Sequence, residues 1–192
     1  MYNNQYLPEL SRPAGLKMLW LCTALLGLLF CSSLPAKSER KIETIATSDI
    51  AKSDRQRSIV AQLAKENFGN VRLQGNLSDL DYLQKIVDRG LINQSDTYDL
   101  QALGIILGDV MVRNLGLTWV VVDDRYGRSR ALRLGDSDNL FFPVTMISRR
   151  VQAKLPVDVR QLYQETADEV KTLRERYNKY PRLPRPKYQN SL

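Results

Sequence analysis

The chain of 192 residues has no histidine and only two cysteines, Cys22 and Cys31, which both fall in one apolar stretch near the N-terminus. The rest of the chain therefore offers neither imidazole nor thiolate. This excludes Ser-His-Asp and Cys-His catalysis, redox-active thiol pairs, and zinc sites made of these ligands. Because that part of the chain can form no disulfide, its stability must come from an ordinary hydrophobic core. We expect no metal and no cofactor.

The apolar stretch from Met18 to Phe30 is typical of an export signal. It is shorter than the roughly 20 residues that a membrane-spanning helix needs. We therefore favour a cleaved signal over residues 1–36, with Ala36 before the cut. A retained anchor is the alternative, and residues 18–34 would then contact the membrane. Because basic residues also follow the stretch, the charge rule does not fix the orientation of such an anchor.

The rest of the chain divides into three parts. Residues 37–48 read as a linker, residues 49–179 as a single domain, and residues 180–192 as a basic, proline-rich tail for which we predict disorder. Within the domain, helical patterns cover about 49–68, 78–90 and 97–114, strand patterns cover 117–124, 129–134 and 140–144, and helical patterns cover 143–150 and 157–179. This order predicts an α+β fold: N-terminal helices, a three-stranded antiparallel meander, then C-terminal helices.

Two local patterns in this domain predict how particular helices begin and pack. Ser78 and Asp81 resemble a capping box at the start of the second helix. Gly104 and Gly108 are four residues apart on the third helix, which carries an apolar stripe. We expect these glycines to let that helix approach the sheet closely.

Adjacent carboxylates, Asp123 and Asp124, close the strongest strand. Neighbours on a strand point to opposite faces, so the two should not converge on a metal or substrate. The simpler interpretation is that Asp124 bonds backbone N–H groups of the following turn. The segment 136–139 starts like a calcium loop but lacks the later glycine and glutamate, so a turn is favoured there too.

Arginines gather on the predicted hairpin and on the helix that follows it. If Arg130 and Arg149 share a face, they would form a site for an anion or an acidic partner. The simpler alternative is solvated charges with one internal pair to Asp123 or Asp124. The candidate binding residues are Asp109, Asp123, Asp124, Tyr126, Arg128, Arg149 and Arg150. A second basic set runs from the last helix into the tail: Arg174, Arg176, Lys179, Arg182, Arg185 and Lys187.

Three sequence blocks carry a family resemblance. They are Leu103-Gly-x-x-Leu-Gly-Asp109, Trp119-Val-Val-Val-Asp-Asp-x-Tyr-Gly-Arg128 and Phe142-Pro-Val-Thr-Met-Ile-Ser-Arg-Arg150. Together they resemble an uncharacterised bacterial domain family, DUF 3806, over about residues 58–170. The resemblance implies a small α+β domain of bacterial origin and brings no activity, cofactor or catalytic residue. It draws attention to the positions that match: Asp109, Trp119, Asp123, Tyr126, Gly127, Arg128, Ser148 and Arg149.

These features favour an exported, non-enzymatic binding domain, periplasmic or anchored to the inner membrane with the domain in the periplasm. Its expected partner is an acidic protein or the anionic cell envelope, and not nucleic acid. The alternative is a carboxylate-dependent hydrolase or transferase of the envelope, using Asp109 with Asp123 or Asp124 near Arg128. A third hypothesis is that the last helix and the tail bind membranes.

Overall fold

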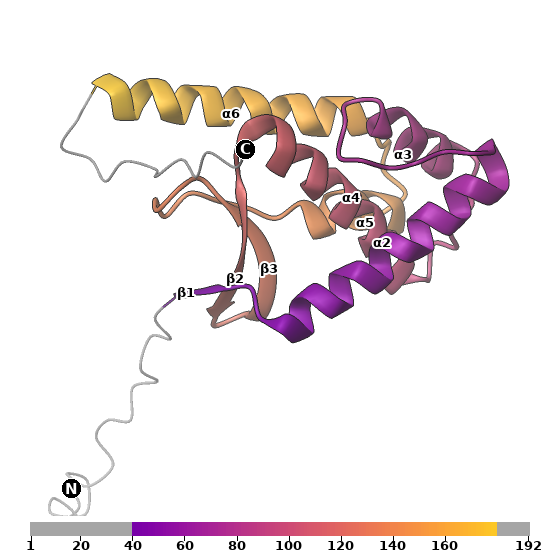
Figure 1. Cartoon of the computed structure of the whole chain (residues 1–192), viewed down its shortest axis with the longest axis horizontal. Helices are drawn as coiled ribbons and strands as arrows, with labels where there is room; N and C mark the ends of the chain where they lie inside the picture. Colours follow the sequence, from indigo (N-terminus) through magenta and orange to yellow (C-terminus); the bar gives the residue numbers. More distant parts are fainter. Residues whose placement is uncertain (1–39, 180–192) are drawn as a thin grey trace, which may run out of the picture. The chain divides into compact units, whose positions relative to one another are not determined.

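In the computed structural model, residues 40–179 are described. They form a mixed helix and strand domain (Figure 1). The elements in chain order are β1 (Lys41–Thr44), α2 (Thr47–Phe68), α3 (Asp79–Asp88), α4 (Thr97–Leu115), β2 (Thr118–Asp124), β3 (Gly127–Arg133), β4 (Leu140–Phe141), α5 (Pro143–Gln152) and α6 (Val159–Lys179). The α+β class is confirmed.

The strands form one antiparallel sheet of four, in the order β1-β2-β3-β4. The expectation of a three-stranded meander was wrong, because residues 41–44 form a strand inside the segment 37–48 that we predicted to be a linker. This strand pairs with β2, so that Lys41 lies opposite Asp123 and Thr44 opposite Val120. Helix α2 also begins earlier than predicted, at Thr47.

Strand β1 was not predicted from the sequence because of its position at the edge of the sheet. It is an edge strand of four residues, exposed at both ends, and edge strands are often short and charged. Its charged side chains are used locally: Lys41 Nζ lies 2.5 Å from Glu43 Oε1. The ammonium group holds the pKa of Glu43 below its ordinary value, by hydrogen bonding and then by charge. Such a sequence reads as polar linker unless its partner strand is known.

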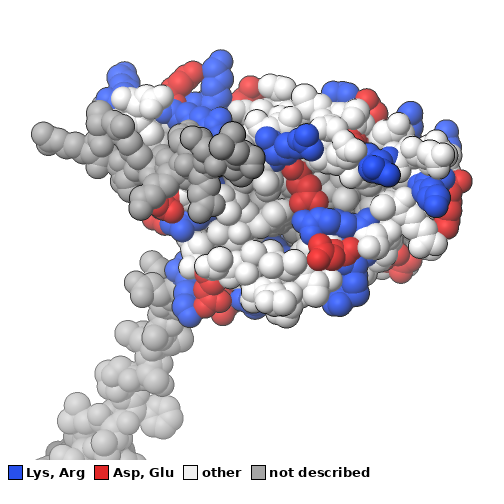
Figure 2. All heavy atoms as spheres, viewed as in Figure 1, with Lys and Arg blue, Asp and Glu red and all other residues white. Residues whose placement is uncertain are grey.

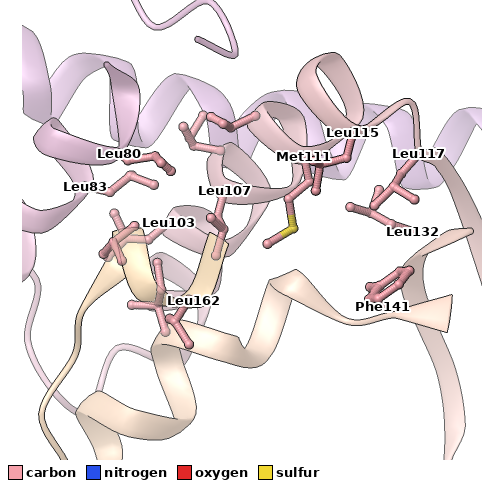
Figure 3. Packing of buried hydrophobic residues seen from close by; sticks show 14 of the residues in the cluster. Leu80, Leu83, Leu103, Leu107, Met111, Leu115, Leu117, Leu132, Phe141 and Leu162 are labelled. Carbon is pink, nitrogen blue, oxygen red and sulfur yellow. The ribbon is translucent and has the colours of Figure 1, made fainter. Parts of the chain in front are cut away.

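Helix α4 is the centre of the hydrophobic core. The predicted apolar stripe, Leu100, Leu103, Leu107 and Met111, is at most 2% exposed. Figure 3 shows Leu103, Leu107 and Met111 of this stripe among leucines of α3, β3 and α6, and the cluster extends to Phe141 of β4. Three neighbouring positions on other faces of α4 are also buried (Ile105, Ile106 and Val110). A helix that is apolar on most of its sides is buried on most of its sides.

The two glycines of α4 permit close contacts, as expected, but with different neighbours. A Cβ added at Gly108 would lie 2.6 Å from Cη2 of Trp119, so this glycine admits the indole of β2. A Cβ added at Gly104 would lie 2.6 Å from Cα of Val144, which belongs to α5. Only one of the two glycines therefore serves the contact between helix and sheet.

The start of α3 corrects another expectation. Ser78 makes no capping hydrogen bond with its side chain, and Asp81 instead pairs with Arg160 of α6. The buried carboxylate of Asp79 organises the turn. Its Oδ2 accepts hydrogen bonds from three consecutive backbone N–H groups, those of residues 74, 75 and 76, at 2.8, 2.7 and 3.2 Å.

Two predicted segments fall outside the described residues: the signal or anchor over residues 1–36, with its apolar part 18–34, and the tail 180–192. Between residues 40 and 179, no helix is long and apolar enough to cross a membrane.

Candidate functional site

A basic hollow of about 610 Å³ lies beside strand β3. Its lining combines Arg40 before β1, the hairpin, residues from both ends of α5, and single residues of α2 and α4. The lining residues are Arg40, Lys52, Gln101, Asp124, Tyr126, Arg128, Ser129, Arg130, Phe142, Val144, Thr145 and Arg149. Five of these are Lys or Arg, against one Asp. Between residues 40 and 179 the sequence holds 22 Lys and Arg against 19 Asp and Glu, so the net positive charge gathered here exceeds that of the whole described domain.

The lining of the hollow is less mixed in charge than the face drawn in Figure 2. Figure 2 shows one face on which Lys and Arg side chains are interspersed with Asp and Glu. Mixed charges of this kind partly cancel at a distance, whereas a hollow lined mainly by one sign concentrates its potential. The hollow, with five Lys or Arg against one Asp, is therefore a candidate site for a negatively charged group.

Arg130 is the best-positioned cation of the hollow. Its Nη1 donates to Ser53 Oγ at 2.7 Å and its Nη2 to Gln56 Oε1 at 2.8 Å. Both partners are neutral and buried, at 3% and 0% exposure, and Gln56 is itself fixed through its bond to the carbonyl of Tyr98. Burial lowers the pKa of Arg130 from its ordinary value, and the charge of Asp49 opposes this. The guanidinium is thus oriented without being neutralised.

Two of the five N–H donors of Arg130 are used in this way, since a guanidinium carries five. No carboxylate between residues 40 and 179 forms an ion pair with Arg130, Lys52 or Arg149. Lys52 lies over the ring of Tyr98, 6.0 Å from its centroid. Within the described part of the chain, these three cations therefore have no carboxylate paired with them.

Arg128 differs from its neighbours because its charge is compensated. Its guanidinium contacts Asp49 Oδ2 at 2.5 Å and Glu43 Oε2 at 3.3 Å. These contacts connect β3 to β1 and α2. The hypothesis of an internal pair with Asp123 or Asp124 is replaced by these two partners.

Aromatic side chains stand at the rim of the hollow. Tyr126, at the hairpin tip, is 81% exposed, and Phe142 is 39% exposed. Arg125 lies over the Tyr126 ring at 4.6 Å and donates to its hydroxyl. The hollow therefore offers apolar contact beside its charges.

Asp109 is placed elsewhere. It lines a separate hollow with Arg57, whose Nε and Nη2 donate to its two carboxylate oxygens, both at 2.7 Å. Trp119 Nε1 donates to the same carboxylate at 3.1 Å. The bond to Asp109 raises the pKa of Arg57 above its ordinary value. Asp109 thus joins α2, α4 and β2, which is a structural role.

The other candidate binding residues, Asp123, Asp124 and Arg150, do not form one site together. Asp123 is exposed on β2, and Asp124 Oδ1 accepts the backbone N–H of Tyr126 at 2.8 Å, which confirms the turn interpretation. Arg150 does not line the basic hollow and donates to the carbonyl of Met146. Among the described residues, no group of three or more acidic or cysteine side chains could hold a metal ion.

The second basic set is only partly described. Arg174 is half-buried, and its Nη2 donates to the carbonyl of Leu115 at 2.6 Å, at the end of α4. Arg176 and Lys179 are exposed on the last turn of α6. The other members lie outside the described residues: Arg182, Arg185 and Lys187.

Sequence reasoning missed the residues that α2 contributes, Lys52, Ser53, Gln56 and Arg57. A signal for two of them was present. Ser53 and Gln56 lie on the same buried stripe of α2 as Val60 and Ala64. Two polar residues at the start of an otherwise apolar stripe indicate a polar partner, because buried polar groups are almost always hydrogen-bonded.

Comparisons with known proteins agree with this fold. No curated protein matched the sequence. A crystal structure from Bacteroides thetaiotaomicron matches with a TM-score of 0.63 at 19% identity, over 72% of this chain. The match spans 51% of that structure, so it supports the fold alone. Residues 79–163 match the model of the family described as Domain of unknown function (DUF3806), which confirms the resemblance to a DUF3806-like family over this segment.

Proposed function

We propose that this domain is a non-enzymatic binding domain whose basic hollow receives an anionic group of a partner. The observation that carries the proposal is Arg130, which buried neutral side chains orient while no carboxylate of residues 40–179 forms an ion pair with it. Holding a guanidinium in this way excludes most rotamers before any ligand arrives. A ligand then loses less free energy to ordering on binding.

The chemistry of the lining favours a carboxylate or a similar oxyanion. A guanidinium matches the geometry of such a group with two parallel N–H···O bonds, and these charge-assisted bonds are stronger than neutral ones. Lys52 and Arg149 add charge on α2 and α5. Of the partners predicted from the sequence, an acidic protein suits a walled hollow better than a flat envelope surface does.

The alternative hydrolase or transferase finds no support in this arrangement. It needed Asp109 to meet Asp123 or Asp124 near Arg128. Asp109 and Asp124 line different hollows, and the oxygens of Asp109 already accept three hydrogen bonds. A general base must instead reach its substrate.

Export remains part of the proposal. The apolar segment 18–34 would direct the chain to the periplasm, either free after cleavage or anchored in the inner membrane. The N-terminal sequence and the cell fraction of the expressed protein test this. A mature protein that starts near residue 37 in the periplasmic fraction is expected, and an intact chain in the cytosol would contradict it.

Binding is tested with the full-length chain and a fluorescent peptide of alternating glutamate and valine. We expect charge reversal at the hollow, Lys52→Glu or Arg149→Glu, to weaken binding about five- to tenfold each, because each replaces attraction with repulsion. The matched controls are Lys171→Glu and Arg72→Glu, which are exposed outside the hollow. Equal losses in both pairs would mean that the peptide responds to net charge alone, and would contradict the proposal.

A further inference from the structure

The first half of strand β3 has an open edge. Strand β4 pairs with β3 at two positions only, Leu132 with Phe141 and Arg133 with Leu140. On the other side, β2 pairs with β3 along its whole length. Among residues 40–179, the backbone from Gly127 to Ala131 is therefore paired with β2 on one side and with no strand on the side of β4.

The register identifies which backbone groups face this open side. Along an antiparallel strand, successive residues direct their N–H and C=O groups to alternate sides. The N–H of Leu134 donates to the carbonyl of Asn139, on the side of β4. Arg128 and Arg130 have the same parity as Leu134, so their backbone groups face the open side, whereas those of Ser129 face β2.

Pro143 explains why the ladder stops. Continuing the register of β4 would place Pro143 opposite Arg130, but proline has no N–H to donate. Pro143 instead starts helix α5. Arg128, Ser129 and Arg130 thus line the basic hollow together with the first turn of α5.

We propose that an extended acidic peptide segment of a partner protein binds in this hollow as an added strand beside β3. The inference rests on the proposed function and states how the partner is held. The backbone of the peptide would pair with the free groups of Arg128 and Arg130, the mode known as β-strand addition. The occupant is acidic because the walls are basic.

The two sides of the sheet also specify a pattern for the peptide. The side chain of Arg130 reaches α2, so peptide residues on that face meet the cations of the hollow. On the opposite face, Ala131 belongs to a small apolar cluster with Val120 and Val122. Because side chains alternate along a strand, we expect acidic residues alternating with apolar or β-branched ones.

Amide hydrogen exchange of the full-length chain, followed by NMR, tests the pairing. With the peptide of alternating glutamate and valine, the backbone amides of Arg128 and Arg130 should exchange at least about tenfold more slowly, since pairing protects an amide. The amides of Ser129 and Ala131 are the internal controls, because they already pair with β2. Their exchange should change little.

Two further peptides provide the matched control on the ligand side. In one peptide the backbone nitrogens of the odd-numbered residues carry N-methyl groups, and in the other those of the even-numbered residues do. Strand addition predicts that one of these two peptides no longer binds and that the other still binds, because only alternate N–H groups of the added strand face β3.

The outcomes separate the two proposals. Binding that depends on Lys52 and Arg149, without amide protection and with equal affinity for both methylated peptides, would overturn strand addition and leave the binding function standing. No binding of any acidic peptide, or capture of anionic lipid vesicles alone, would overturn both.

Discussion

The most direct test of the fold concerns the carboxylate that joins α2, α4 and β2. Replacing Asp109 with asparagine removes the charge and one of its two acceptor oxygens. Arg57 then loses its two-point ion pair with residue 109, and the contact of its Nη1 with Asp54 is its remaining ion pair among the described residues. The indole N–H of Trp119 competes for the remaining oxygen.

The size of the effect follows from the contacts. A hydrogen bond to a charged group contributes about 1.5–3 kcal/mol, and at least one of the three is lost outright while another loses its charge. The side chains of Arg57 and Asp109 are 33% and 24% exposed, so solvent screening reduces the sum. We expect Asp109→Asn to lower the free energy of unfolding by about 2 kcal/mol, or the melting temperature by about 4–8 °C.

The chain contains its own control for this measurement. Arg160 and Asp81 form a similar two-point pair at 2.9 Å, but their side chains are 57% and 51% exposed. Both variants are compared by urea titration, monitored by circular dichroism. Asp81→Asn should lower the free energy of unfolding by less than about 0.5 kcal/mol. Equal losses for the two variants, or a loss under about 0.5 kcal/mol for Asp109→Asn, would refute the assigned role of the carboxylate.

Three further predictions use other features. Gly104→Ala should lower the stability measured by thermal unfolding by about 1–3 kcal/mol, because the added Cβ meets the backbone of Val144. Helix propensity alone predicts that alanine would raise the stability by about 1 kcal/mol, so an increase in stability would contradict this packing. Asp79→Asn should lose about 1–3 kcal/mol and speed amide exchange at residues 74–76, since the buried carboxylate accepts all three N–H groups; unchanged exchange there would contradict the contact. Because Lys and Arg supply all the cations of the hollow, affinity for an acidic peptide should stay level from about pH 6 to 9 and fall below about pH 5 as the glutamates of the peptide protonate; a change near pH 7 would contradict this.

Periodicity predicted most of the fold. The stripe of α4 and the alternation of β3 fixed the type of element, because burial on one face imposes a period on the sequence. Strand β1 escaped prediction for the converse reason: its stability comes from pairing with β2, and its own residues carry little apolar pattern.

The candidate site was predicted in part. Arg130 and Arg149 line one hollow, as hypothesised, and Arg128 lines it too, while Asp109 and Arg150 do not. A sequence shows which residue types are present, but not which distant element supplies their partners. The support of Arg130 by Ser53 and Gln56 crosses from β3 to α2, and only the folded structure brings them together.

The pairing of β1 also has a kinetic consequence. Thr44 pairs with Val120, 76 positions further along the chain, whereas β2 and β3 are joined by a two-residue turn. Closing a long loop costs conformational entropy that the short hairpin avoids, and contacts between distant residues slow folding. The hairpin should therefore form early, and the first strand of the sheet should be added last, after the helices have brought the two ends of that loop together.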